Sequence, residues 1–221
     1  NQIDVGVEYK KNEVGKIGVN IFYNYIQHYI QGIILSPSVV KSQTQGVIGV
    51  KQFKNMKSAI FKGIELKYIS DTMMRKVILE LGGGYTQGNI KDIEKYIVKN
   101  KQVVDKMLIS NDYISEIPPA KFNFSIKYLT FNNRLMFNID FQYSFAQNRV
   151  SEANYEFKTP DYGLFNMLLS YRFGNSLHLI GGVDNIFNKL YYDHLNRRVI
   201  GSTEKIYERG RSYFLNLLLN F

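Results

Sequence analysis

The sequence contains no cysteine and no tryptophan, and only four of its 221 residues are proline. Without cysteine, a disulfide framework and a thiolate metal site are both excluded. The low proline content argues against a disordered or low-complexity chain. Since any cellular compartment tolerates a protein without cysteine, localisation has to be argued from other features.

A long hydrophobic run is also missing. No stretch of 18 apolar residues occurs, which excludes a transmembrane helix but not a membrane barrel, because barrel strands carry only an alternating pattern. The chain opens on NQIDVGVEYK, already strand-like, with neither an initiator methionine nor a signal peptide. We therefore expect that a preceding part of the protein has been removed or is missing.

The motifs of familiar enzymes are absent too. The sequence has no HExxH, P-loop or GxGxxG motif, no paired-carboxylate signature, and no Ser/His/Asp set with a recognisable spacing. The run Gly82-Gly83-Gly84-Tyr85 is not a phosphate loop, because no helix follows it, and we expect a strand interior that needs slim side chains. The pair Met73-Met74 falls in a predicted short turn. We predict no catalytic residues, no metal site and no cofactor.

The formal net charge is +9. Such a charge is compatible with nucleic acid, an anionic membrane surface or an anionic ligand as partner, and also with lysine and arginine that merely solvate loops. We expect loop solvation to account for most of it and predict no nucleic-acid partner.

Period-two alternation of large apolar residues with polar or small ones is the main feature that is present. The segment 135–145 sustains it for about 11 residues, where a globular strand has about five or six and a bilayer-crossing strand needs about 9–11. The 17 tyrosines and 15 phenylalanines also favour strands. Nine strands are predicted, at 3–9, 17–25, 64–68, 77–85, 122–128, 135–145, 165–173, 177–184 and 213–221.

The connections between these strands alternate in length. Short ones cover 10–15, 70–76, 130–134 and 173–176, and long ones cover about 31–58, 90–118, 147–160 and 188–208. Ordinary domains keep most of their loops short, whereas an outer-membrane barrel has short turns on one rim and long loops on the other. The pattern indicates an all-β, antiparallel, up-and-down transmembrane barrel.

Tyrosines mark the ends of the apolar faces. A ring of tyrosines at the level of the lipid headgroups would produce this placement. A soluble sandwich with tyrosines at the edge of its core is the alternative, and it requires the apolar faces to pack together. The tyrosines concerned are Tyr9, Tyr25, Tyr68, Tyr85, Tyr128, Tyr143 and Tyr171.

Five sequence segments resemble TonB-dependent outer-membrane receptors, in the order of that family. They are NIFYNYIQHYI, AIFKGIELKY, EIPPAKFNFSIKY, GGVDNIFNKLYYDHLNR and RGRSYFLNLLLNF. Physical reasons support parts of the pattern, since Asn185 and Asn188 tolerate turn conformations and Gly210 permits the backbone to re-enter the sheet. The segment around YYDHLNR is similar to the copper-receptor and cobalamin-like branch.

The resemblance implies a receptor that takes up a scarce metal or metal chelate, such as copper, a ferric siderophore or cobalamin. Since these plugged barrels have about 22 strands, residues 1–221 would be the C-terminal part, without the N-terminal plug and the earlier strands. Implied partners are outer-membrane lipid and lipopolysaccharide, the plug domain, the TonB complex and the barrel-assembly machinery. The terminal Phe221 would be the signal that this machinery reads.

Substrate contacts are predicted in the last long loop, where external binding residues belong. The candidates are Tyr191, Tyr192, His194 and Arg197, although His194 also suits a loop-stabilising role. His28 and His178 suit structural roles, with His178 facing the lumen. Two other function classes remain as alternatives, a small outer-membrane barrel enzyme and a soluble all-β binding module.

Overall fold

The computed structural model describes residues 1–12, 14–35, 50–70, 76–99, 102–196 and 204–219. In this part of the chain, no helix is long and apolar enough to cross a membrane. The regular structure consists of antiparallel strands, and most of them form where the sequence alternates apolar with polar or small residues.

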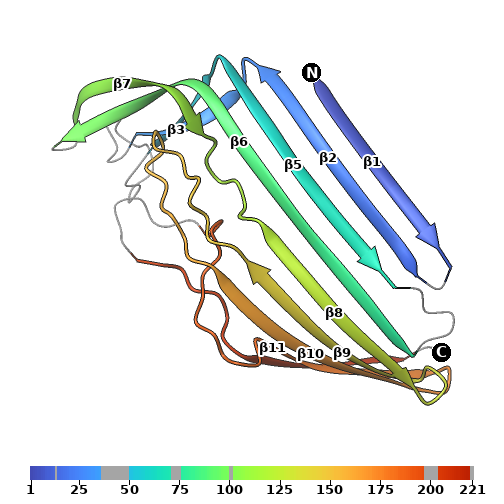
Figure 1. Ribbon diagram of the computed structural model, residues 1–221. Coiled ribbons are helices and arrows are strands. Elements are labelled where there is room, and N and C mark those ends of the chain that lie inside the picture. The colour runs from blue at the N-terminus through green and yellow to red at the C-terminus, as the bar shows by residue number, and fades with distance from the viewer. Residues whose placement is uncertain (13, 36–49, 71–75, 100–101, 197–203, 220–221) are drawn as a thin grey trace.

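Nine strands lie side by side in one curved sheet, here called the wall (Figure 1). Each wall strand pairs antiparallel with the next one along the path, as an up-and-down sheet requires. In order, the wall strands are β1 (Gln2–Lys11), β2 (Gly15–Gln27), β5 (Ser58–Ile69), β6 (Val77–Lys99), β8 (Lys121–Thr130), β9 (Leu135–Ser144), β10 (Tyr162–Phe173), β11 (Leu177–Asp184) and β12 (Ser212–Leu219).

The nine predicted strands coincide with the nine strands of the wall, so this part of the prediction is confirmed. The last of them is described only to Leu219, and the final two residues lie outside the described part. Short turns join the strands at one end, here called the short-turn rim. The other end, from which the long connections leave, is the long-loop rim.

Three strands were not predicted. The connections 31–58 and 90–118 were expected to be long loops, but β3 (Ile30–Leu35) pairs with β4 (Val50–Asn55), and the far half of β6 pairs with β7 (Gln102–Tyr113). β6 is therefore 23 residues long and continues past the wall. The single-face alternation fails here because these strands pack on one another instead of on lipid.

A small buried cluster explains why these hairpins form. Its members come from β3, β5, β6 and the segments that follow β4, β7 and β9, and they are almost without solvent exposure. Burial of apolar side chains stabilises by about 25 cal/mol for each Å² removed from water. The cluster therefore fixes the hairpins over the long-loop rim; it consists of Ile33, Met56, Ala59, Ile90, Ile93, Ile114 and Ala153.

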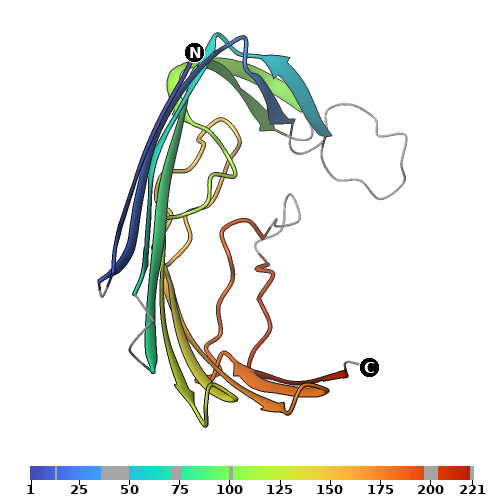
Figure 2. The same ribbon diagram turned by 90° about the vertical axis from the view of Figure 1, so that its right-hand side faces the viewer.

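The two faces of the wall differ in chemistry. The register places Val5, Ile21 and Ile64 side by side on the convex face, where they are 57%, 54% and 37% exposed. The concave face carries the intervening polar residues and glycines. The segments 145–161 and 185–196 lie on this concave side, and the hairpins at the long-loop rim lean toward it (Figure 2).

The soluble-module alternative requires the apolar faces to be covered by another protein layer. In the described residues, the large apolar side chains of the convex face stay exposed along the length of the wall, from Ile3 in β1 to Leu215 in β12 at 73%. A contiguous apolar surface of this extent is typical of contact with lipid.

The short-turn rim carries tyrosines on the convex face, as predicted. Tyr9, Tyr68, Tyr128 and Tyr171 each lie within a few residues of a strand end at this rim. The Tyr68 hydroxyl donates a hydrogen bond to the carbonyl oxygen of Val14 in the adjacent turn, at 2.9 Å. This arrangement suits a ring that keeps its body in lipid and its hydroxyl at the polar boundary.

The two faces predict opposite responses to a new charge. Ile139→Arg places a cation on the convex face in the middle of β9, where the Ile139 side chain is 51% exposed, and should cost about 2–4 kcal/mol of folding free energy in lipid. Gln142→Arg, on the concave face of the same strand, is the matched control and should cost little. Denaturant titration of the protein in lipid vesicles measures both. Equal costs would contradict the assignment of the faces.

Candidate functional site

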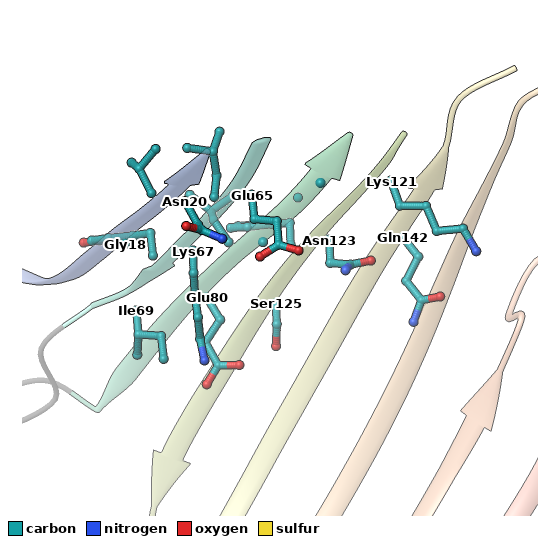
Figure 3. Close-up of a pocket in the computed structure, with 18 of the residues that line it drawn as sticks. Gly18, Asn20, Glu65, Lys67, Ile69, Glu80, Lys121, Asn123, Ser125 and Gln142 are labelled. Atoms are coloured by element: carbon teal, nitrogen blue, oxygen red, sulfur yellow. The ribbon is translucent and has the colours of Figure 1, made fainter. Parts of the chain in front are cut away.

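The concave face of the wall forms a hollow of about 890 Å³ that β1, β2, β5, β6, β8 and β9 line. Its floor combines polar side chains of the concave face with apolar ones such as Ile69 (Figure 3). Side chains of both charges meet here with amides and a hydroxyl. The labelled polar residues are Asn20, Glu65, Lys67, Glu80, Lys121, Asn123, Ser125 and Gln142.

Glycines widen this hollow. Gly18 and Gly82 lie on either side of Lys67 in the register, and a Cβ atom added at either glycine would meet nothing within 4 Å. The glycine run of β6 is therefore a strand interior, as predicted. Gly82 leaves room over the wall, whereas a Cβ atom at Gly83 would lie 3.2 Å from the Lys121 carbonyl oxygen within it.

Ion pairs neutralise several charges of the concave face. Lys127 Nζ lies 2.6 Å from Glu80 Oε1, and Lys16 Nζ lies 2.6 Å from Glu8 Oε2. These pairs are partly exposed, so each contributes at most about 1 kcal/mol. They pair two acidic residues that line the hollow, Glu8 and Glu80, with lysines of the same face.

Asp112 anchors the segment 145–161 to the hairpin of β6 and β7. This carboxylate is only 6% exposed and accepts hydrogen bonds from Ser151 Oγ at 2.9 Å and from the backbone N–H groups of Glu152 at 3.0 Å and Ala153 at 2.9 Å. A buried charge needs such partners. One side chain therefore fixes three successive residues of a long connection.

Glu156 joins three connections at the long-loop rim. Its Oε1 accepts the backbone N–H of Glu116 at 2.7 Å, and its Oε2 accepts that of Ser151 at 2.7 Å. The same Oε1 lies 3.2 Å from Nε2 of His194, whose Nδ1 lies 3.2 Å from Thr159 Oγ1. The segments that follow β7, β9 and β11 thus meet at this carboxylate.

The surroundings of His194 correspond to the loop-stabilising role named in the sequence analysis. Its side chain is 2% exposed, and both ring nitrogens have protein partners. In this conformation the ring offers no free nitrogen to a substrate. Whether His194 contacts substrate is not tested by this geometry and stays a prediction.

Asp193 fastens the same connection to the wall. Burial alone would raise the pKa of Asp193, but hydrogen bonds from Lys121 Nζ at 2.8 Å, the Leu195 N–H at 3.0 Å and the Tyr162 hydroxyl at 2.8 Å outweigh burial, and the net pKa is lowered. The carboxylate therefore stays charged. Tyr191 stacks on Tyr162 with ring centroids 4.6 Å apart.

Two of the predicted substrate-binding residues, Tyr191 and Tyr192, have different neighbours in the described part of the chain. Tyr192 packs against Tyr207 with ring centroids 5.8 Å apart, and Lys205 Nζ lies 4.9 Å from its ring centre, whereas Tyr191 faces Tyr162. Arg197, Phe221, Met73 and Met74 lie outside the described residues. Of the two other histidines, His178 has a hydrogen bond of 2.6 Å between its Nε2 and Ser170 Oγ.

The turn that starts the last long connection matches its prediction. Asn185 and Asn188 have positive φ angles of 51° and 52°, which asparagine tolerates better than most residues. The Asn185 side chain also donates to and accepts from the backbone of Lys189, at 2.9 and 2.8 Å. At Gly210, just before β12, an added Cβ would lie 2.6 Å from Asn188 Oδ1, which accepts the Arg211 N–H at 2.9 Å, so a residue without a side chain lets the backbone pass close to this turn as it re-enters the sheet.

A second charged cluster ties β4 to the far half of β6. Glu94 accepts hydrogen bonds from Lys54 Nζ at 2.7 Å, the Tyr96 hydroxyl at 2.6 Å and Lys106 Nζ at 3.1 Å. These three donors, led by Lys54, lower the pKa of Glu94 from 4.5 to about 2. Lys54 Nζ also donates to the Tyr96 hydroxyl.

No group of three or more histidine, aspartate and glutamate side chains in the described part of the chain is placed to hold a metal ion. The acidic residues that matter here, Asp112, Glu94 and Glu156, were not singled out by sequence. Most of their partners lie 38 to 41 residues away in the chain, so no spacing motif marks them. From the sequence alone, only their location in the predicted long connections could be recognised.

Removing the Asp112 carboxylate should release the segment 151–153. Asp112→Ala leaves Ser151 Oγ and two backbone N–H groups without their acceptor, which costs about 2 kcal/mol or more. We expect hydrogen exchange of the Glu152 and Ala153 amides to accelerate at least about tenfold. Asp105→Ala, at the exposed tip of the same hairpin, is the control; unchanged exchange in Asp112→Ala would disprove the anchor.

The Glu94 cluster should weaken in acid. A carboxylate whose folded pKa is lowered stabilises the fold above its unfolded pKa, here 4.5, and this contribution is lost as the pH falls toward about 2. We expect the hairpin of β3 and β4 to detach progressively over this range, measured by limited proteolysis with pepsin. In Glu94→Gln the dependence on pH should largely vanish, and an unaltered profile would count against the cluster.

A family model described as "TonB dependent receptor-like, beta-barrel" matches residues 1–186. A sequence search of curated proteins gives no match. Solved structures similar in fold include a copper transporter, OprC, with a TM-score of 0.76 and 20% identity over 100% of this chain and 31% of that one. The FrpB iron transporter of Neisseria meningitidis (F3-3 variant) has a TM-score of 0.69 and 14% identity over 98% of this chain and 30% of its own.

A mutant of the ferric enterobactin receptor PfeA of Pseudomonas aeruginosa has a TM-score of 0.62 and 18% identity, over 100% of this chain and 31% of that chain. At these identities the likeness shows the fold alone, and this chain spans about three tenths of the length of each structure. The family match covers 186 of 221 residues and agrees with the nine-stranded antiparallel wall. The chain belongs to the TonB-dependent receptor-like β-barrel family.

Proposed function

We propose that this chain is the C-terminal part of a TonB-dependent outer-membrane receptor that takes up a scarce metal or metal chelate and catalyses no reaction. The observation that carries the proposal is the wall itself, with an exposed apolar convex face, a polar concave face and long connections gathered at one rim. A membrane barrel with external binding loops has this organisation. The family match over residues 1–186 supports it.

The edges of the wall support the view that further strands complete it. In the described residues, β1 pairs only with β2, and β12 pairs only with β11. Each edge therefore presents a row of unpaired backbone groups, which a hydrocarbon environment does not tolerate. We propose that strands of the same receptor outside these residues close the barrel.

The concave hollow supports a plug domain as the covering partner. The space above Gly18 and Gly82 and the mixed polar floor around Glu65 suit a protein segment that hydrogen-bonds to the wall. Such a plug would gate the lumen and would contain the segment that engages the TonB complex. Phe221 is proposed as the assembly signal on the strength of its sequence motif.

We propose that external substrate is captured by the connection that follows β11. Tyr191 packs on Tyr162, and His194 contacts Thr159 and Glu156. We therefore propose that both residues position this connection. His194 would contact substrate directly only after its ring leaves Thr159 and Glu156. Tyr192 and Arg197 are then the proposed direct contacts.

The proposed substrate class is supported by the sequence resemblance and by the similar structures, which include a copper transporter, an iron transporter and a ferric enterobactin receptor. The outer-membrane location is part of the same proposal. A site at the outer rim of a small barrel enzyme would need a nucleophile and a base side by side. The carboxylates that we find there instead accept hydrogen bonds from backbone and loop side chains.

Membrane fractionation and growth test the proposal. The full-length receptor should be recovered from outer membranes only with detergent, and deletion of its gene should slow growth when copper, iron or cobalamin is limiting. Complementation with the wild-type gene is the control for effects of the deletion on the expression of neighbouring genes. A folded, detergent-free monomer would overturn the membrane assignment, and a deletion strain indifferent to all three nutrients would overturn the substrate class.

A further inference from the structure

A row of cationic and imidazole side chains crosses three neighbouring strands at the short-turn rim. Arg134 precedes β9, Arg172 is near the end of β10, and His178 is near the start of β11. The Arg172 N–H donates to the Arg134 carbonyl at 2.9 Å, and Arg172 is the cross-strand partner of His178. The three residues therefore lie at one height, and they line a common hollow on the concave side.

Two like charges are thus placed opposite each other across neighbouring strands. Such a pair destabilises a sheet unless a counter-charge neutralises it. Among the described residues, no ion pair joins Arg134 or Arg172 to a carboxylate. The nearest acidic residues on the concave face of the same strands, Asp140 and Asp184, are both six residues further along their strands from the row, which is about 20 Å.

The rest of the concave face is organised differently. Glu80 pairs with Lys127, Glu8 pairs with Lys16, and Lys121 pairs with Asp193. The wall therefore pairs several of its own charges along β1 to β8, whereas the two arginines at β9 and β10 have no ion-pair partner among the described residues. They differ from the other concave-face cations without an ion pair, such as Lys10 and Lys67, in lying side by side on neighbouring strands.

The hollow beside this row has an apolar floor. Its volume is about 180 Å³, enough for a small side chain or ligand fragment. Ser170 holds the His178 ring through the hydrogen bond of 2.6 Å to Nε2, so the ring is fixed at the edge of the hollow. The apolar lining consists of Leu129, Met136, Leu168 and Ile180.

We propose that Arg134, Arg172 and His178 form a binding site for a carboxylate whose apolar part rests on this floor. Arginine binds carboxylate through parallel, charge-assisted hydrogen bonds, and a carboxylate between the two guanidinium groups removes their repulsion. The carboxylate comes either from an acidic side chain of the receptor's own polypeptide or from a free organic anion in the lumen. The site does not depend on which substrate the receptor carries.

The test uses the purified full-length receptor in a non-ionic detergent, so it is independent of transport and growth. N-acetyl-leucine is the probe, and its amide, which has the same side chain without the charge, is the matched ligand control. Saturation-transfer NMR measures binding, and circular dichroism measures the thermal midpoint. The test variant combines Arg134→Gln with Arg172→Gln. The control variant is Lys10→Gln, which removes a cation from the same rim and the same face, but at β1, away from the row.

Two results support the site and separate the sources of the carboxylate. If a free anion occupies it, N-acetyl-leucine binds at least about tenfold more weakly to the double variant than to the wild type, while the amide does not bind. If the receptor's own polypeptide occupies it, the wild type does not bind the probe and the double variant melts at a lower temperature than Lys10→Gln.

Other results overturn the proposal. It fails if the wild type does not bind the probe and the double variant melts at or above the wild-type temperature, since removal of unneutralised arginines relieves repulsion. It also fails if Lys10→Gln weakens binding as much as the double variant, since the rim then attracts anions without a defined site. An unchanged circular dichroism spectrum at low temperature establishes that each variant is folded.

Discussion

The hydrogen-bond ladder of the wall is the constraint on which the rest of the structure depends. Within hydrocarbon, a backbone N–H or C=O group has no water to bind, so each strand must pair on both sides. Among the described residues, the seven inner strands of the wall meet this requirement through continuous antiparallel registers, and β1 and β12 form its two edges. Because the registers fix which side chains share a face, they also produce the apolar convex surface and the polar hollow behind it.

Above the wall the physical chemistry changes. The hairpins at the long-loop rim are held by a small apolar cluster and by buried or half-buried carboxylates, in the manner of a water-soluble domain. Asp112, Glu94 and Glu156 each collect several donors from different segments. The long connections are therefore organised by specific polar contacts, and the hollow lies beneath a structured rim.

The sequence predicted the wall well, because lipid on one side and water on the other impose a strict alternation on every strand. Leu135 to Phe145 shows this most clearly, and the turn at Asn185 and Asn188 was predicted for the reason that its φ angles confirm. The strands β3, β4 and β7 were missed, because they pack on each other and on Ile90 and Ile93. Asp112 and Glu156 accept hydrogen bonds from partners about 40 residues away, and no local sequence pattern predicts such a contact.

The meeting of three connections at Glu156 limits how this rim can vary. The connection after β9 carries the carboxylate, while the connections after β7 and β11 supply the Glu116 N–H and the His194 ring. Replacing any one of these connections with that of a related barrel would leave a hydrogen-bonding group of another connection without its partner. These three connections are therefore coupled, and a change in one has to be matched in the other two.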